Sequence, residues 1–357
     1  MPSFLVNTPQ RSYPVVVERG VHARLGQYLP EKAGKVFILT TPDVWELHAA
    51  RLAPGLADRS HEILLFPGGE ERKRLAWVEA LAEEMVRRGG DRSSLVLAFG
   101  GGIVNDLGGF LAAVFMRGVR LIQLPTTLLA QVDAGLGGKT AVNLEAGKNL
   151  VGAFHQPLAV LIDPEVLATL PEREYRAGLF EVLKCAVIGS PRLFELLQAR
   201  RAEVLARAPA AVEEMIAESV RIKAEVVSAD ERESDLRRVL NFGHTFGHAL
   251  EAETGYARFL HGEAVGFGMR AATVLAERLG LLPSGEAERI LALLAAYGPI
   301  PAPEGVSAQA LLLRLPSDKK TLRGEVHFVL PEAVGRVRIV SGVDERLVRA
   351  AIETALE

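Results

Sequence analysis

Residues 240–251, LNFGHTFGHALE, place His244 and His248 four positions apart. In a helix this spacing puts both side chains on one face, where two imidazoles can bind one zinc ion. Zinc metalloproteases with such a pair carry a glutamate directly after the first histidine, whereas Thr245 follows His244 here. The pair is therefore not an HExxH motif. The stretch by itself is compatible with two metal ligands, with one, or with two core histidines that have satisfied hydrogen bonds.

Two further segments supply metal-ligand candidates. In YRAGLFEVLKCAVIG, Glu181 and Lys184 lie three apart in an otherwise apolar helical pattern. An ion pair is the simpler interpretation, but a carboxylate in such surroundings needs a strong partner, and a divalent metal would be one. RFLHGEAVGFGM adds His261. Two histidines and one carboxylate with an open position are typical of catalytic zinc, and the single cysteine, Cys185, cannot close a structural site with thiolates.

A glycine-rich loop stands where a strand is expected to meet a helix. The apolar run LVLAF leads directly into GGGIVNDLGGF, so Gly100–Gly102 fall at the strand end, and Asp106 follows closely. Backbone N–H groups and a helix N-terminus at such a place can hold the phosphates of a dinucleotide. The spacing is not GxGxxG, and a tight turn needed for packing explains the glycines as well.

The next stretch, LPTTLLAQVDAGLGGKTAVNLEAGKNLVGAFHQP, is polar and rich in glycine. It contains Thr126, Thr127, Asp133, Lys139, Lys148 and Asn149. Lysine and arginine total 41, of which only nine are lysines. Two of these scarce lysines, Lys139 and Lys148, lie in this stretch. Their charges suit a phosphate or carboxylate, and the threonines and asparagine add directional hydrogen bonds. A solvated polar loop is the alternative.

The order of elements predicts how these residues are positioned. Strand candidates are PVVVERG, KVFILTT, HEILLF, SSLVLAFGGG, VRLIQLPTT and LAVLID, and helical patterns separate them. After Pro164 long helical runs replace the strands, interrupted only by GEVHFVLPEAVGRVRIV, a predicted hairpin. We therefore expect an α/β N-terminal dinucleotide-binding domain, Rossmann-like with a mostly parallel sheet, over residues 1–164. An α-helical metal- and substrate-binding domain should follow over residues 165–357.

Composition limits the classes of partner. The chain has 357 residues, 49% of them hydrophobic, and a formal net charge of −3, so we expect no nucleic acid and no membrane as partner. A single cysteine fits a reducing compartment, and the N-terminal residues show neither a signal-peptide pattern nor a spanning segment. We expect a cytoplasmic protein.

Six motifs taken together resemble the 3-dehydroquinate synthase family of sugar-phosphate cyclases: GGGIVND, LPTTLLAQVDAGLGGKTAVN, GKNLVGAFHQP, LFEVLK, LNFGHTFGHALE and LHGEAVGFGM. The resemblance runs from about residue 40 to residue 330. It implies an NAD-binding α/β domain and a helical domain that holds Zn²⁺ or Co²⁺, with the substrate in the cleft. It also implies a homodimer, in which Arg117 reaches across the interface.

The resemblance assigns residues to each ligand. For the metal it implies Glu181, His244 and His261, with His248 turned toward the substrate phosphate. For NAD it implies Asp43, Glu70, Glu71, Arg72, Lys73, Gly100, Gly101, Gly102, Ile103, Val104, Asn105, Asp106, Thr126, Thr127, Lys139, Lys148, Val166, Leu167, Ala168 and Thr169. For the substrate it implies Arg117, Asp133, Lys139, Asn149, Lys184, Lys223, Arg237, Asn241, His248, Lys319 and Lys320. For catalysis it implies His248, Lys184, Glu233 and Asn241.

The implied reaction converts 3-deoxy-D-arabino-heptulosonate 7-phosphate to 3-dehydroquinate and phosphate in the shikimate pathway, which leads to aromatic amino acids. It proceeds by transient oxidation with NAD, β-elimination of phosphate, re-reduction, ring opening and intramolecular aldol closure. A polyol dehydrogenase of similar architecture would share the glycine loop and the metal set but release NADH. A cyclase for another sugar phosphate and a catalytically silent NAD-binding protein are the remaining alternatives.

Overall fold

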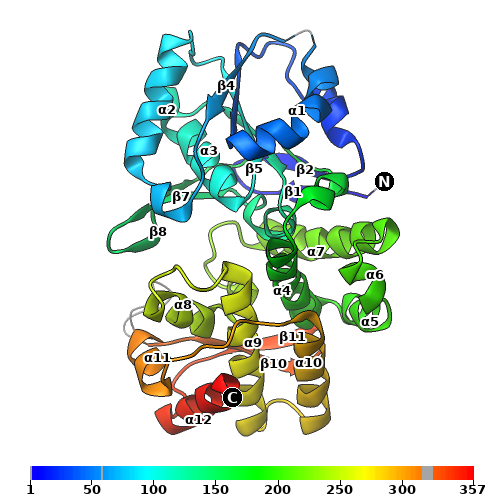
Figure 1. The fold of residues 1–357 in the computed structure, drawn as a ribbon, viewed down its shortest axis with the longest axis vertical. Helices are drawn as coiled ribbons and strands as arrows, with labels where there is room; N and C mark the ends of the chain where they lie inside the picture. The colour runs from blue at the N-terminus through cyan, green and yellow to red at the C-terminus, as the bar shows by residue number, and fades with distance from the viewer. Residues whose placement is uncertain (1, 58, 316–324) are drawn as a thin grey trace. The chain divides into compact units, whose positions relative to one another are not determined.

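A computed structural model describes residues 2–57, 59–315 and 325–357 of the chain (Figure 1). These residues form two compact units. The first comprises residues 1–171 and 212–232, and the second comprises residues 172–211 and 233–357. Within the described residues, no helix combines the length and the apolar character needed to cross a membrane.

The first unit is built around one seven-stranded sheet. Its strands are β1 (Ser3–Asn7), β2 (Ser12–Val17), β3 (Val36–Thr40), β4 (His61–Leu65), β5 (Leu95–Gly100), β6 (Arg120–Pro125) and β9 (Ala159–Ile162). They are ordered β1-β2-β9-β6-β5-β3-β4, and every neighbouring pair except β1 and β2 is parallel. A mostly parallel sheet with flanking helices was predicted, and this prediction is confirmed.

Helices and a hairpin complete the first unit. The helices are α1 (Pro42–Leu56), α2 (Leu75–Arg87), α3 (Gly102–Val114) and most of α7 (Pro209–Ala229). Short helical turns are η1 (Val21–Gln27), η2 (Glu70–Arg72), η3 (Phe115–Arg117), η4 (Ala130–Ala134) and η5 (Pro164–Thr169). The hairpin consists of β7 (Lys139–Leu144) and β8 (Gly147–Phe154).

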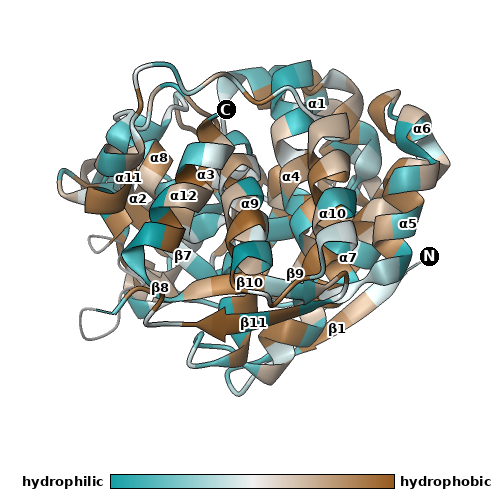
Figure 2. Cartoon of the chain, turned by 90° about the horizontal axis from the view of Figure 1, so that it is seen from below, coloured by the Kyte–Doolittle hydropathy of each residue, from teal (hydrophilic) through white to brown (hydrophobic). Residues whose placement is uncertain are grey.

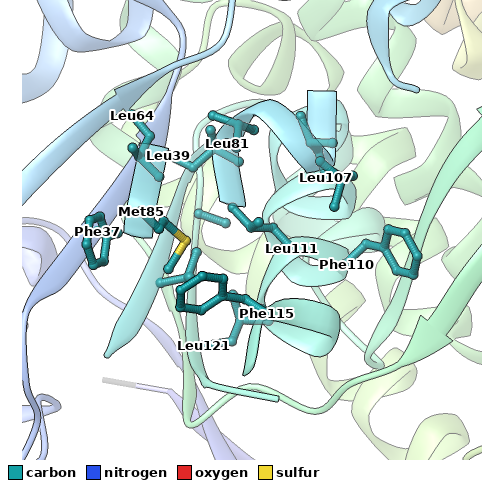
Figure 3. Packing of buried hydrophobic residues seen from close by; sticks show 14 of the residues in the cluster. Phe37, Leu39, Leu64, Leu81, Met85, Leu107, Phe110, Leu111, Phe115 and Leu121 are labelled. Atoms are coloured by element: carbon teal, nitrogen blue, oxygen red, sulfur yellow. The ribbon is translucent and has the colours of Figure 1, made fainter. Parts of the chain in front are cut away.

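Alternate residues of the central strands face two separate cores. From β3, Phe37 and Leu39 point to the core formed with α2 and α3, whereas Ile38 points to the one formed with η1 and α1. Figure 3 shows Leu39, Leu81 and Leu111 of the first core, from β3, α2 and α3, gathered side by side. Successive strand side chains point to opposite faces, so strands buried on both sides read as continuous apolar runs. For this reason the central strands could be predicted from the sequence.

The hairpin β7–β8 was not predicted as strands. Its apolar residues are interspersed with lysine, threonine, asparagine and glycine, so neither a long apolar run nor a clean alternation marks the two strands. The structure nevertheless pairs Lys139 with Phe154 and Val142 with Val151. The residues proposed to bind ligands in this stretch are therefore held on a hairpin rather than on a loop.

The division between the units differs from the boundary expected at residue 164. The first unit continues to residue 171 and takes in residues 212–232, which the helical pattern had assigned to the second domain. Polar contacts explain this, because the Asn7 N–H donates to Ser228 Oγ at 3.0 Å and Lys223 Nζ donates to the Asp133 carbonyl at 2.6 Å. A helical period shows that one face is buried but not which unit buries it.

The second unit is mainly helical. Its elements are α4 (Glu172–Gly189), α5 (Pro191–Ala199), α6 (Arg201–Leu205), η6 (Leu236–Asn241), α8 (His244–Glu253), α9 (His261–Arg278), α10 (Ser284–Tyr297), α11 (Ala308–Arg314), β10 (Phe328–Ala333), β11 (Arg336–Val340) and α12 (Glu345–Leu356). The predicted hairpin is present as β10 and β11. Helix α9 is buried along most of its length and contacts α4, α8, α10 and α12. Figure 2 shows the hydrophilic and hydrophobic bands along α12 that accompany its one-sided burial.

Candidate metal and dinucleotide sites

Glycines let the three helices that carry the candidate metal ligands approach one another very closely. A Cβ atom on Gly262 of α9 would lie 1.8 Å from the Ala177 carbonyl oxygen of α4. A Cβ atom on Gly268 of α9 would lie 1.8 Å from the carbonyl oxygen of Gly243, the residue before α8. Neither position can accommodate a side chain without moving backbone. The glycines around both histidine motifs are therefore required for packing.

This packing brings together Glu181 of α4, His244 of α8 and His261 of α9. Glu181 is fully buried, and its Oε1 lies 3.6 Å from His244 Nε2 and 3.7 Å from His261 Nε2. The ligand atoms of the three side chains all lie within 4.8 Å of one another. Atoms that bind zinc at 2.0–2.1 Å in tetrahedral geometry are separated by about 3.3 Å, so only a small contraction separates this arrangement from a metal site.

The polar atoms of this cluster fit a metal ion. Both carboxylate oxygens of Glu181 are buried and have no hydrogen-bond partner within the described chain, although the ammonium of Lys184, one helical turn on, forms an ion pair with Oε2. His244 Nδ1 lies 3.2 Å from the Phe242 carbonyl oxygen, so a proton on Nδ1 leaves the Nε2 lone pair facing Glu181. A divalent cation would satisfy the buried carboxylate.

His248 is the third imidazole of this region. Its ring centroid lies 5.5 Å from that of His244 and 6.0 Å from that of His261. A second group of potential ligands consists of His248, Glu251 and His261, so His261 belongs to both groups. The resemblance assigned no role to Glu251, although its place seven residues after His244 puts it on the same face of α8. The helical spacing between His244 and Glu251 could therefore have identified this carboxylate as a neighbour of the histidines from the sequence.

Glu263, two residues after His261, serves another purpose. Its carboxylate accepts the Leu260 N–H at 2.8 Å, where α9 begins, and forms a bidentate pair with Arg173 at 2.7 and 2.8 Å. It therefore fixes the start of α9 against α4, which sets the position of His261.

Of the other predicted residues of the second unit, Glu233, Arg237 and Asn241 lie on η6 or just before it, and Lys184 lies on α4. Asn241 Nδ2 donates to Glu233 Oε1 at 2.8 Å, and Glu233 has a left-handed backbone with φ of 59°. Arg237 and Lys184 are almost completely buried. Burial of two cations in the unit that holds the metal candidates is costly unless anions accompany them. Lys319 and Lys320 lie outside the described residues.

In the first unit, the candidate cofactor residues follow the carboxyl ends of parallel strands. The chain turns outward from β3 to β4 and then in the opposite direction from β5 to β6, so adjacent β3 and β5 mark the switch point of the sheet. Ligands of such folds bind at this crevice. Asp43 follows β3, Glu70–Lys73 follow β4, Gly100 ends β5 and Gly101–Asp106 follow it, Thr126 and Thr127 follow β6, and Val166–Thr169 follow β9.

The N-terminus of α3 fits a phosphate group. Within the described chain its first turn has no acidic residue and no side-chain cap, so its N–H groups remain available as donors. A Cβ atom on Gly101 would lie 2.9 Å from Thr127 Cγ2, which keeps this surface as bare backbone. Asn105, by contrast, turns inward and donates to the Ala98 carbonyl at 3.1 Å.

A polar network around the buried Lys73 and Asn143 links three segments of the first unit. Lys73 forms an ion pair with Asp106 and donates to Asn149 Oδ1 at 2.6 Å. Asn143 donates to Glu70 Oε1 at 2.7 Å and accepts the Asn149 N–H at 2.8 Å. Burial raises the pKa of Asp106, and the neighbouring Lys73 ammonium opposes this shift. Sequence reasoning missed Asn143, which stands between the lysines of the polar stretch.

Further predicted residues are arranged in pairs or lie exposed. Lys223 of α7 forms an ion pair with Asp133, and Thr169 Oγ1 lies 2.9 Å from His48 Nε2. Val166 and Leu167 are buried, so only Ala168 and Thr169 of that group offer exposed side chains. Asp43, Glu71, Arg72, Arg117 and Lys139 are exposed, and Lys148 is half-buried.

Solved structures share this architecture over nearly the whole chain. A 2-deoxy-scyllo-inosose synthase complexed with carbaglucose-6-phosphate, NAD⁺ and Co²⁺ superposes with a TM-score of 0.90 at 27% identity, covering 99% of each chain. A 2-epi-5-epi-valiolone synthase from Streptomyces hygroscopicus subsp. jinggangensis 5008, with NAD⁺ and Zn²⁺ bound, gives 0.87 at 30% identity over 98% of each chain. A probable glycerol dehydrogenase from Sinorhizobium meliloti 1021 shares the fold alone, with 0.68 at 16% identity. Fold and site thus define an enzyme of the sugar-phosphate cyclase class.

The chain belongs to the 3-dehydroquinate synthase family. The family's N-terminal domain model matches residues 63–177, and its C-terminal domain model matches residues 178–321. A 3-dehydroquinate synthase from Solibacter usitatus (strain Ellin6076) is 62% identical over 356 residues, covering all of both chains. One from Koribacter versatilis (strain Ellin345) is 49% identical, covering 98% of this chain and 96% of the relative. The resemblance noted from the six motifs is confirmed.

Proposed function

We propose that this chain is a 3-dehydroquinate synthase that uses NAD and a divalent metal, zinc or cobalt, to convert 3-deoxy-D-arabino-heptulosonate 7-phosphate to 3-dehydroquinate and phosphate. The convergence of Glu181, His244 and His261 on one buried point carries the proposal. The two relatives described as 3-dehydroquinate synthases, 62% and 49% identical over nearly the whole chain, support the choice of substrate.

Glu181, His244 and His261 would hold the metal, and the first turn of α3 would hold the pyrophosphate of NAD. When bound, the metal polarises a substrate hydroxyl, and NAD accepts and later returns a hydride. His248 lies beside the ligand histidines and can accept or donate a proton at an imidazole nitrogen.

Cations would neutralise the two anionic groups of the substrate. We assign this role to Arg117, Lys139, Lys184, Lys223, Arg237 and, beyond the described residues, Lys319 and Lys320. Lys184 is an informative case, because its ammonium now pairs with Glu181. A metal that takes over this carboxylate would leave the Lys184 ammonium to an anionic group of the substrate. Its burial would strengthen that interaction, because water screens it poorly.

The Lys73 network would hold the segments that we assign to NAD. Lys73 follows η2 and contacts Asp106 of α3 and Asn149 of β8, so polar contacts connect residues assigned to the cofactor with one assigned to the substrate. Ordered donors and acceptors of this kind lower the entropic cost of placing two ligands together. Asp133, Asn149, Asn241 and Glu233 would orient hydroxyl groups of the substrate.

One assay tests the proposal. Purified enzyme with zinc, the heptulosonate phosphate and a trace of NAD should release one phosphate per substrate consumed, without accumulation of NADH. Stoichiometric NADH without phosphate release would point to a polyol dehydrogenase. Turnover of glucose 6-phosphate or of another heptulose phosphate, but not of this substrate, would point to a different cyclase. The cytoplasmic location and the homodimer stay predictions, the latter open to analytical ultracentrifugation.

A further inference from the structure

We propose that Glu251 is a positioning residue that fixes the ring of His261, so that Nε2 and not Nδ1 of this histidine binds the metal. The inference rests on the metal-dependent function proposed above. It concerns a residue of α8 that lies outside the Glu181, His244 and His261 set and one helical turn beyond His248.

The ring of His261 lies between two buried carboxylates. Its Nε2 is 3.7 Å from Glu181 Oε1, and its Nδ1 is 3.3 Å from Glu251 Oε2. Glu181 is fully buried and Glu251 is 2% exposed. The two carboxylates come from different helices, α4 and α8, so the two nitrogen atoms of one imidazole face two separately anchored acceptors. Rotation of the ring would lose both contacts.

An ionised Glu251 would determine which nitrogen carries the proton. A carboxylate only accepts hydrogen bonds, so it favours the tautomer of His261 with the proton on Nδ1. The lone pair then lies on Nε2, on the side of Glu181. A carboxylate behind a ligating histidine also raises the basicity of the ring, which strengthens metal binding.

His244 shows the same division of roles. Its Nδ1 lies 3.2 Å from the Phe242 carbonyl oxygen, and its Nε2 lies 3.6 Å from Glu181 Oε1. Both rings thus place an acceptor behind Nδ1 and turn Nε2 to the same carboxylate oxygen. The acceptor is a neutral carbonyl for His244 and a carboxylate for His261. Glu251 is therefore expected to contribute more to metal affinity than a backbone contact would.

A different arrangement would make Glu251 itself a ligand, together with His248 and His261. Glu251 Oε2 faces Nδ1 of His261, so a metal held by both residues would take Nδ1, whereas the first scheme keeps a proton on that nitrogen. Glu181 favours the first scheme. Its Oε1 is buried, has no hydrogen-bond partner among the described residues, and lies almost equally far from both Nε2 atoms. A metal bound at the second group would leave that oxygen uncompensated.

The proposal is tested by substituting Glu251 and measuring the zinc affinity of each variant by competition with a chromophoric chelator. Glu251→Ala should weaken zinc binding about 10- to 100-fold, and Glu251→Gln should weaken it less, because the amide oxygen can still accept from Nδ1. Glu253→Gln is the matched control, since Glu253 lies on the same helix and pairs with Arg314 at 3.0 Å. This control should bind zinc as the unsubstituted protein does.

Two outcomes would overturn the proposal. Zinc affinity of Glu251→Ala equal to that of the control would mean that Glu251 does not position the ring. Loss of zinc in Glu251→Gln as complete as in Glu181→Gln would make Glu251 a ligand. An unsubstituted protein that binds no zinc would instead refute the proposed metal-dependent function. The failure of one proposal is therefore distinguishable from the failure of the other.

A second measurement requires no substitution. The chain has eight histidines, and labelling them with ¹⁵N allows the protonated and metal-bound nitrogens to be distinguished by NMR in the zinc-loaded protein. We expect His261 to show a metal-bound Nε2 and a protonated Nδ1. A metal-bound Nδ1 would overturn the proposal even if every Glu251 variant failed to fold.

Discussion

Replacement of Gly262 by alanine tests whether close helix contact positions the metal ligands. Residue 262 lies in the first turn of α9, where alanine has the better intrinsic helix propensity by about 1 kcal/mol. Propensity alone therefore predicts that Gly262→Ala stabilises the protein. The structure predicts the opposite sign, because the new Cβ would lie 1.8 Å from the Ala177 carbonyl oxygen, whereas real Cβ contacts essentially never fall below 3.0 Å.

The two values set the size of the effect. Backbone must move by at least 1.2 Å, the difference between 3.0 and 1.8 Å, because no side chain can rotate away from a carbonyl group. Such overpacking costs about 1–3 kcal/mol, which corresponds to a fall in Tm of roughly 2–12 °C for a unit of this size. Metal sites tolerate ligand shifts of only about 0.2 Å, so zinc affinity should fall about tenfold or more because His261 is the neighbouring residue.

The assay is thermal unfolding together with chelator competition for zinc. Gly285→Ala on α10 is the control, since a Cβ atom there meets nothing within 4 Å. This control should be neutral or stabilising by up to about 1 kcal/mol and should keep the zinc affinity. If Gly262→Ala matched the control in both measurements, the contact between α4 and α9 would not position His261, and the reasoning would be refuted.

Three further predictions address other parts of the chain. His244→Ala should lose zinc, whereas His248→Ala should keep zinc and lose turnover. Metal analysis together with the phosphate-release assay measures both properties. Loss of zinc in both variants would instead favour His244 and His248 as a pair of metal ligands. Asn143→Ala removes three hydrogen bonds around Glu70 and Asn149, which should cost about 1–3 kcal/mol and raise KM for NAD at unchanged zinc affinity. Burial lowers the pKa of His22 from 6.5 to about 4, so the unfolded chain binds more protons in that interval and stability should fall by about 3 kcal/mol from pH 6.5 to pH 4. Urea unfolding followed by tryptophan fluorescence should show this slope, and His22→Gln should flatten it; an equal slope in both proteins would assign it to other groups.

The sequence by itself determined the elements whose residues are buried on both sides. The central strands β3 and β5 are nearly continuous apolar runs because helices cover both faces of the sheet. In β6 the apolar run is interrupted by Gln123, which is buried and donates to the Asn105 carbonyl at 3.2 Å. Gly100–Gly102 marked the strand-to-helix turn, where a Cβ atom on Gly100 would collide with Val104 and one on Gly101 with Thr127. Long, ordered motifs such as LNFGHTFGHALE further identified the family, which composition could not do.

Only the tertiary structure decided which distant residues meet. Periodicity fixes the face on which a side chain lies but not the helix that packs against that face. Periodicity therefore left open whether His244 pairs with His248 of its own helix or with Glu181 and His261, and only the family resemblance favoured the second set. In the structure, the glycine contacts between α4, α8 and α9 bring Glu181, His244 and His261 together. The same reason explains the missed role of Glu251 and the placement of residues 212–232, since a carboxylate or a helix face acquires its partner only when separate segments pack.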